Sequence, residues 1–391
     1  MYIFRRILNL MKTLAKILSA ALAICMMLTL CACHSKDETA LTIENEKITS
    51  ALYLNALIDC DSEAKKRVDD QIAAEKEKED ANKTEETDTT EETDYYAQTL
   101  DGLKFTEYVK SKALDRCKEF IFYKKLVSDG TIKLDDTKRS EAESYAQSYW
   151  AQYGYAYLYE PNGVSFDTYK EAFTYSYYSN EYFNHLYAEG GEKEVPKDDI
   201  KNNMLENYVL AHVLTATYEE NATDAQKAEH KKKLEGYVTR LKAGETFEKI
   251  YLEHNNIKEE EHKHEETEDG PKVQHANILA DKNSETGYAN ADFDSIYDLK
   301  TGETAIIENE DKTAITLYVK LDIASDEYYL KTLTDTILYE MKEKEFQDFV
   351  SEKTKDYKVE ENSFAINRFK VEKIDYSVLE SAYAAQAQAQ Q

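Results

Sequence analysis

Aromatic side chains are the residues whose number and spacing point most directly to a chemical role in this chain. It contains 31 tyrosines and 13 phenylalanines among 391 residues. They are densest between residues 145 and 187, at Tyr145, Tyr149, Trp150, Tyr153, Tyr155, Tyr157, Tyr159, Phe166, Tyr169, Phe173, Tyr175, Tyr177, Tyr178, Tyr182, Phe183 and Tyr187. These are too many for one face of a helix. The tyrosines therefore either form a helical core whose hydroxyls reach solvent, or the surplus lines a groove for extended apolar peptide.

For the groove, six of these aromatics are the candidate binding residues. These candidates are Tyr149, Trp150, Tyr153, Tyr169, Phe173 and Tyr177. Aromatic surface suits this role because it binds apolar chain without requiring one particular side-chain shape. The core and the groove are compatible, so both interpretations stay open.

Histidines beside acidic residues are a second candidate for chemistry. His262 and His264 lie in the run KEEEHKHEETEDG, and His275 follows shortly after. Imidazole and carboxylate bind divalent metals, but this spacing lacks a rigid ligand set, and a solvated acidic loop explains the same residues. We therefore expect no metal and no cofactor. The sequence also contains no Ser/His/Asp set, phosphate-binding loop or Cys-x-x-Cys motif.

The first 32 residues have the layout of an export signal. Their charged side chains are Arg5, Arg6, Lys12 and Lys16, with no acidic residue. The apolar run Ile17 to Leu30 that follows is too short for a good membrane-spanning helix. Translation from Met11 would still leave a positive start, so Met1 and Met11 both remain possible initiators.

The signal ends on Leu30-Cys31-Ala32-Cys33, which resembles the lipobox of bacterial lipoproteins. In that motif the cysteine is acylated and becomes the new N-terminus. Cys33 fits better than Cys31, because Leu30 is too bulky for the position just before the cut. The resemblance implies a lipid anchor on Cys33 at the extracytoplasmic face of the cell membrane. An ordinary secretory signal with a chance cysteine is the alternative.

Charge limits the partners of the exported chain. The formal net charge is -28, and loss of residues 1–32 lowers it to about -32. Such a chain will not bind nucleic acid through phosphate contacts. The mature chain keeps Cys60 and Cys117, both on predicted helices, as buried thiols or as a disulfide.

Periodicity predicts a mainly helical protein with one smaller mixed domain, the α+β class. A strand or hairpin over 41–49 precedes a helix that Thr49 caps. Further predicted helices cover 103–130, 136–153, 165–187, 198–206, 224–242, 245–255 and 327–353, and predicted strands cover 208–215, 305–308, 313–322 and 364–371. The segment 75–94 contains no large apolar residue, and we expect it to be a disordered acidic insertion.

The order of elements in the second half resembles a known family. Val195–Ile200, Glu206–Leu214, Leu241–Glu248 and the turn Asp298–Glu303 are similar to parvulin-type peptidyl-prolyl isomerase domains. With flanking helices, a lipobox and the opening Ile43–Thr49, the chain resembles the PrsA and SurA group of extracytoplasmic foldases.

The resemblance implies a helical chaperone domain, like the N-terminal domain of SurA, that is split by an inserted parvulin-like α+β domain. The implied map is a signal at 1–32, a tether at 33–40, a helical domain at 41–195, a parvulin-like domain at 196–324 containing an acidic insertion at 258–272, a completing helix and strand at 325–375, and a low-complexity tail at 376–391.

In the parvulin pattern, a histidine on the first strand, a histidine on the last strand and a ring-holding aromatic surround the proline. The resemblance assigns the first to His212 and the aromatic to Phe293. The second histidine is missing, since Thr316 stands nearest its place and no histidine follows His275. Whether isomerase activity survives therefore stays open.

The resemblance implies a membrane-anchored folding factor that acts on unfolded or partly folded exported proteins. Two alternatives remain: a holdase whose parvulin-like domain only binds or spaces, and a non-catalytic surface lipoprotein that binds a peptide or solute. The oligomeric state is not predicted.

Overall fold

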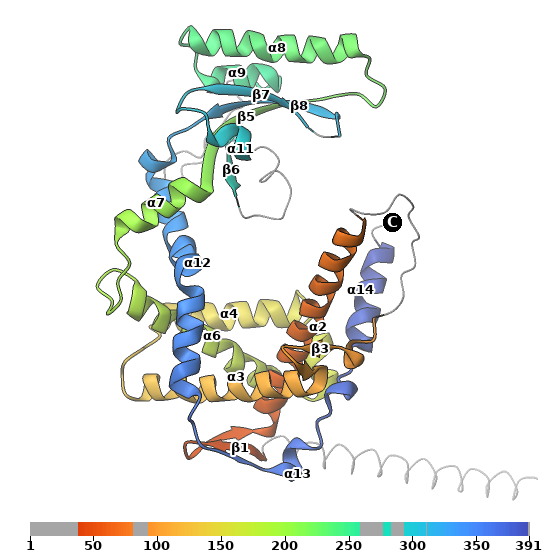
Figure 1. Cartoon of the computed structure of the whole chain (residues 1–391), viewed down its shortest axis with the longest axis vertical. Helices are drawn as coiled ribbons and strands as arrows, with labels where there is room; N and C mark the ends of the chain where they lie inside the picture. Colours follow the sequence, from red (N-terminus) through yellow and green to blue (C-terminus); the bar gives the residue numbers. More distant parts are fainter. Residues whose placement is uncertain (1–37, 81–92, 259–276, 283–292, 310, 390–391) are drawn as a thin grey trace, which may run out of the picture. The chain divides into compact units, whose positions relative to one another are not determined.

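Residues 38–80, 93–258, 277–282, 293–309 and 311–389 are described by the computed structural model of the chain (Figure 1). The signal, Cys33 and both possible start positions lie outside these residues, as do most of the two acidic segments. Within the described part, no helix combines the length and the apolar character that crossing a membrane requires.

A three-stranded antiparallel sheet joins two distant parts of the chain. β1 (Thr39–Ile43) lies between β2 (Glu46–Thr49) and β9 (Val359–Glu361), with Leu41 opposite Glu361. The first structural unit is accordingly built from two stretches, one ending at Leu186 and one beginning at Glu345. The residues between them, Tyr187–Lys344, form the second unit.

Two long helices form the centre of the first unit. The Thr49 hydroxyl accepts the backbone N–H of Leu52 at 3.2 Å and caps α2 (Ser50–Asp80), as predicted. α2 packs along α3 (Phe105–Ser128). Cys60 of α2 and Cys117 of α3 are buried free thiols, and burial raises the pKa of Cys60 to about 12. Both cysteines therefore remain protonated at neutral pH.

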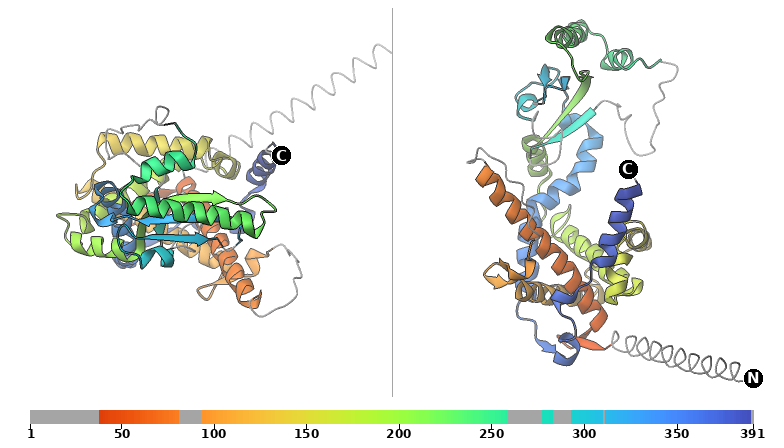
Figure 2. Two further views of the ribbon diagram at one scale, coloured as in Figure 1. Left: turned by 90° about the horizontal axis from the view of Figure 1, so that it is seen from above. Right: turned by 90° about the vertical axis from the view of Figure 1, so that its right-hand side faces the viewer.

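The aromatic-rich stretch forms three further helices. They are α4 (Asp136–Ala151), α5 (Ala156–Asn162) and α6 (Phe166–Tyr187). The Asp135 side chain caps α4, and Gly163 ends α5 at a φ of 93°, where glycine avoids the strain of a Cβ atom. The C-terminal helix α14 (Ser377–Ala389) lies beside α5 (Figure 2).

Short elements complete the first unit. They are η1 (Tyr95–Ala97), β3 (Thr99–Leu100), β4 (Leu103–Lys104), α13 (Ser363–Ile366) and η4 (Val371–Lys373).

A four-stranded antiparallel sheet forms the second unit, in the order β6 (Asn277–Asp281), β5 (Tyr208–Thr217), β8 (Ala314–Lys320) and β7 (Thr304–Glu308). α8 (Asp224–Lys242) and α9 (Phe247–His254) cover one face, and α11 (Phe293–Tyr297) covers the other (Figure 1). A separate apolar cluster fills each side of the sheet.

Two α-helices and one short 3-10 helix flank this sheet in the sequence. They are α7 (Lys197–Asn207), η3 (Ile323–Ser325) and α12 (Glu327–Thr354). Arg240 fixes α8 to α9 by pairing with Glu245 and Glu253, each with a closest contact of 2.6 Å.

The α+β fold class, mainly helical, is confirmed, and several element predictions need correction. Residues 75–80 of the expected acidic insertion continue α2, and the expected strand over 364–371 contains the short helix α13 instead. Most of the expected low-complexity tail forms α14. The compact units of the structure divide between Leu186 and Tyr187 and, inside α12, between Lys344 and Glu345, whereas the predicted domain boundaries follow residues 195 and 324.

Candidate functional site

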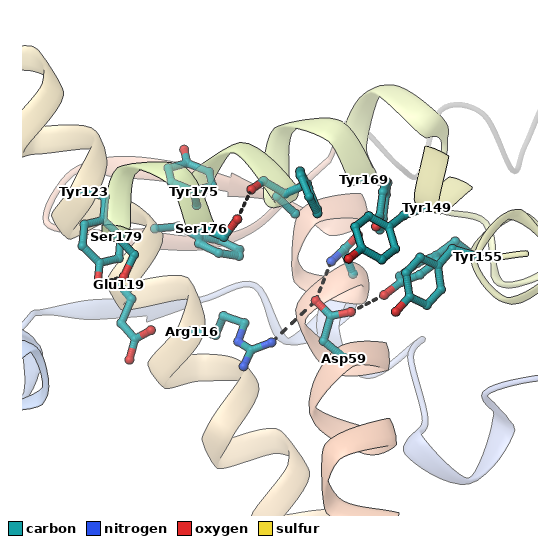
Figure 3. A pocket seen from close by; sticks show the side chains of 15 residues that line it. Asp59, Arg116, Glu119, Tyr123, Tyr149, Tyr155, Tyr169, Tyr175, Ser176 and Ser179 are labelled. Carbon is teal, nitrogen blue, oxygen red and sulfur yellow. Dashed lines mark hydrogen bonds and ion pairs between the residues drawn. The ribbon is translucent and has the colours of Figure 1, made fainter. Parts of the chain in front are cut away.

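A cavity of about 520 Å³ lies among the helices of the first unit (Figure 3). α2 and α3 supply most of its polar side chains, and α4, α5 and α6 supply most of its aromatic wall. Its lining residues are Asn55, Asp59, Arg116, Glu119, Phe120, Tyr123, Tyr149, Tyr155, Tyr159, Tyr169, Ala172, Phe173, Tyr175, Ser176 and Ser179.

The aromatic wall is a chain of rings in mutual contact. Tyr155 stacks on Tyr149 with ring centroids 5.6 Å apart and lies 5.9 Å from Tyr169. Tyr169 in turn lies 5.1 Å from Tyr159 and 6.0 Å from Phe173. Such offset and tilted pairs are the favoured aromatic geometries, so the rings of the wall support one another.

Of the six predicted binding residues, Tyr149, Tyr169 and Phe173 line the cavity. The Trp150 side chain is only 7% exposed and packs behind the wall, 5.3 Å from Tyr169. The other two lie beside the lining residues: Tyr153 is 62% exposed and 5.1 Å from Tyr149, and Tyr177 is 6.0 Å from Phe173. Trp150 is therefore a core residue, and five of the six form or border the wall.

Asp59 is the polar centre of the cavity. Its carboxylate accepts hydrogen bonds from the Tyr159 hydroxyl and, at 2.8 Å, from Asn55 Nδ2. Arg116 Nη1 lies 3.7 Å away. Burial raises the pKa of Asp59 to about 6, although the hydrogen bond from Tyr159 and the charge of Arg116 oppose the rise. Asp59 is thus ionised at neutral pH and protonated in mild acid.

Two other acceptors in the cavity have no partner among the described residues. Glu119 is half-buried, forms no hydrogen bond or ion pair, and has a pKa that burial raises. Figure 3 shows it on the opposite side of Arg116 from Asp59. The Asn55 side chain is 1% exposed, and its Oδ1 atom is buried without a hydrogen-bond donor.

Sequence reasoning did not find the polar residues of this cavity. Asp59 falls on the apolar face of its helix, three residues after Ala56 and seven after Leu52. A carboxylate at such a position is the signal that was available, because buried acids are rare unless they are paired or functional. Nothing in the sequence indicates that Arg116 approaches Asp59 or that Glu119 lines the same cavity.

His212 is enclosed by its neighbours in the second unit. Its Nδ1 lies 2.5 Å from Asn277 Oδ1, and its ring stacks on Phe247 with centroids 4.2 Å apart. Burial lowers the pKa of His212, against the raising effect of the bond to Asn277. The residue facing it on the closing strand is Val319. His212 is therefore a hydrogen-bonded, neutral histidine within the sheet.

Phe293 lies on the other face of the same sheet. Side chains alternate along a strand: Leu214 of β5 belongs to the cluster that contains Phe247, and Ala211 to the cluster that contains Phe293. Phe293 is 3% exposed. Within the described residues, His212 and Phe293 thus do not bound a common pocket, and the expectation that both hold one proline ring finds no support in their geometry.

Thr316, at the position expected for the second histidine, does not contact His212 across the sheet. It faces Thr215, and their hydroxyl oxygens lie 3.0 Å apart. The metal candidates His262, His264 and His275 lie outside the described residues, as does Cys33.

Solved structures with a similar fold include PrsA foldases, the group that the sequence resembles. PrsA from Bacillus subtilis is 17% identical with a TM-score of 0.30, and the match covers 67% of this chain and 92% of that one. PrsA from Lactococcus lactis is 16% identical with a TM-score of 0.36, covering 66% and 87%. PrsA from Streptococcus pneumoniae is 14% identical with a TM-score of 0.30, covering 66% and 91%.

No protein-family model matches the chain, and no curated protein matches it. Likeness to solved structures at these values does not establish what the chain binds or catalyses.

Proposed function

We propose that this chain is a folding factor, tethered outside the cell membrane by lipid on Cys33, that binds extended segments of unfolded exported proteins without isomerising proline. The aromatic cavity of the first unit is the observation that carries the proposal. It would act as a holdase, since holding an apolar segment keeps that segment from aggregating.

The composition and size of the cavity support peptide binding. A volume of about 520 Å³ lies within the range of about 300–1,000 Å³ that is usual for ligand sites. Tyr149 and Phe173 are half-buried, and Tyr153 extends the aromatic surface outward. Covering such surface stabilises a complex by about 25 cal/mol per Å² before entropic losses.

The surroundings of His212 argue against isomerase activity. Rotation about the peptide bond must overcome a barrier of about 18–20 kcal/mol. Lowering it requires a pocket that grips the proline ring beside polar groups that stabilise the twisted carbonyl. The His212 ring is instead hydrogen-bonded to Asn277 and stacked on Phe247. Phe293 is buried on the opposite face of the sheet.

Two assays on the purified full chain test this function. We expect suppression of aggregation of an unrelated unfolded protein, and no acceleration of proline isomerisation in a model peptide. The double variant Tyr149→Ser with Phe173→Ser should weaken suppression several-fold, because it removes apolar contact area from the wall. Tyr145→Ser is the matched control, since Tyr145 lies on α4 like Tyr149, is 50% exposed and does not line the cavity.

Failure of the wild-type chain to suppress aggregation would contradict the holdase. A strong isomerisation rate that His212→Ala abolishes would instead favour the enzyme.

A further inference from the structure

We infer that the aromatic cavity selects basic side chains, so that the segments it binds present a lysine ammonium or an arginine guanidinium to Asp59, while Glu119 adds negative charge on the other side of Arg116. This inference rests on the proposed function and names the chemistry of its ligand. Four independent features of the cavity support it.

The first feature is an excess of negative charge. Arg116 is the cation of the cavity lining, and its Nη2 binds both oxygens of Glu63 at 2.9 and 3.1 Å. Its contact with Asp59 is longer, 3.7 Å. Glu119 forms no hydrogen bond or ion pair within the described residues, although the charges of Arg116 and Lys112 oppose the rise that burial causes in its pKa. The cavity lining itself thus carries two carboxylates, those of Asp59 and Glu119, and one guanidinium that Glu63 already binds, so a second cation would balance its charge.

The second feature is the arrangement of rings near Asp59. Tyr149, Tyr155 and Tyr169 gather on the same side of Arg116 as Asp59 (Figure 3). The faces of aromatic rings attract cations, and the attraction is greatest where water is excluded. Tyr169 is buried and Tyr149 is half-buried. A cation next to Asp59 would thus meet a carboxylate and aromatic surface together.

The third feature is a shortage of hydrogen-bond donors. Asn55 is 1% exposed and lines the cavity, and its Oδ1 atom has no donor within the described part of the chain. Its Nδ2 atom already donates to Asp59 at 2.8 Å, which assigns the unpartnered atom as an acceptor. A buried acceptor without a partner is costly and is satisfied by an N–H group. Lysine and arginine offer N–H donors and no acceptor. A quaternary ammonium has no N–H group and so cannot donate a hydrogen bond.

The fourth feature is the charge of the whole chain. A net charge of -28 attracts basic segments and repels acidic ones before any contact forms.

A set of short fluorescein-labelled peptides tests the inference on the purified full chain. The peptides share one apolar background and differ at one central position: lysine, norleucine, trimethyllysine or glutamate. Norleucine keeps the length of the lysine stem without charge, and trimethyllysine keeps the charge without N–H donors. By fluorescence anisotropy, we expect the lysine peptide to bind about tenfold more tightly than the norleucine peptide or the trimethyllysine peptide. The glutamate peptide should bind most weakly.

Charge-removing variants provide a second arm. Asp59→Asn and Glu119→Gln should each reduce the lysine preference over norleucine to about twofold or less. Glu107→Gln, an exposed acid on the same helix as Glu119, is the matched control and should keep the preference. Circular dichroism checks that the variants fold, and the wild-type peptide series decides the question if they do not.

The outcomes separate the two proposals. Equal binding of the lysine and norleucine peptides overturns the selectivity but leaves the holdase intact. Equal or tighter binding of trimethyllysine overturns the role of N–H donors. If none of the peptides binds, the holdase and the selectivity both fail.

Discussion

Asp59 carries a charge on a helix face that is largely buried, and the structure shows how the charge is tolerated. Hydrogen bonds from Asn55 and Tyr159 and the charge of Arg116 offset part of the cost of burial. The offset is incomplete, because the pKa of Asp59 still rises from its ordinary value of 3.8 to about 6. The protein therefore keeps at this position a charge that weakens its own fold.

Replacement of that charge should stabilise the protein. A group with a raised pKa in the folded state favours folding at low pH and loses that contribution as the pH rises through about 6. Asp59→Asn should thus increase the free energy of unfolding by about 1–3 kcal/mol at pH 8 and by much less at pH 4. The introduced amide oxygen can still accept from Tyr159, and a flipped Asn55 amide can accept from the introduced N–H group. Denaturant titrations at both pH values measure this, and a variant that is less stable at pH 8 would contradict it.

The affinity for basic peptides should increase as the pH rises, whereas the stabilising contribution of Asp59 decreases. The groups that set the charge of Asp59 are Glu63 and Asn55 on its own helix, Arg116 from α3 and Tyr159 from α5. Because Asp59 gains a proton below a pH of about 6, the affinity for the lysine peptide should fall between pH 7.5 and about 5. The norleucine peptide serves as the control. Anisotropy titrations across this range would contradict the role of Asp59 if both peptides changed alike.

His212 should prove dispensable for holding unfolded chains. Its pKa is lowered by burial, so it stays neutral at pH 7 and contributes to stability that is lost as the pH falls. We expect His212→Ala to lower the free energy of unfolding by about 1–3 kcal/mol, because it removes the bond to Asn277 and the stacking on Phe247. Suppression of aggregation should not change. A large loss of suppression at a temperature where the variant is folded would contradict this prediction.

At the scale of elements, the C-terminal segment is held against the helices by specific polar contacts. The Tyr376 hydroxyl donates to Asp61 Oδ2 at 2.6 Å, and Lys65 Nζ lies 3.0 Å from the same oxygen and 3.8 Å from the centre of the Tyr376 ring. Asn162 at the end of α5 bonds the backbone N–H and C=O of Asp375 at 2.8 and 2.9 Å. These contacts explain why a sequence of low complexity is ordered as α14.

Loss of the Tyr376 hydroxyl should weaken this docking. Asp61 is fully buried, and its Oδ1 atom already lacks a partner among the described residues. Tyr376→Phe should therefore cost about 1–3 kcal/mol and increase amide hydrogen exchange in α14. Tyr383→Phe is the control, because Tyr383 is 52% exposed on α14. Unchanged exchange and melting temperature in Tyr376→Phe would show that the hydroxyl contributes nothing.

At the scale of the whole molecule, the proposed lipid anchor would place the cavity at the membrane. Cys33→Ser should release the protein from membranes or leave an uncleaved signal, because the lipid proposed on this residue would supply the anchor. Cys31→Ser, two residues earlier, should remain at the membrane. Membrane fractionation and intact mass measure both. Unchanged fractionation and mass of the Cys33 variant would disprove the assignment of the lipidated residue.

Local sequence was sufficient for many individual elements. The Thr49 cap and the bounds of α8 were predictable because capping and helical periodicity depend on neighbouring residues. The same holds for the α+β class. β6 was not predicted, since a strand as short as Asn277–Asp281 depends on its pairing with β5.

Tertiary packing alone determined the candidate site. The neighbours Tyr149 and Trp150 have the same chemical character in sequence, yet one lines the cavity and the other is buried behind it. Phe293, on α11, packs against the face of the sheet opposite His212. The order of motifs in the sequence cannot reveal this, because adjacent residues of β5 point to opposite faces. Asp59 comes from α2, Arg116 and Glu119 from α3, and the aromatic wall from three later helices. The sequence by itself determined that the chain is acidic, aromatic-rich and mainly helical, and it predicts an export signal. Only the packing of helices far apart in the chain decided which aromatics meet which charges, because burial and pairing are properties of the assembled core.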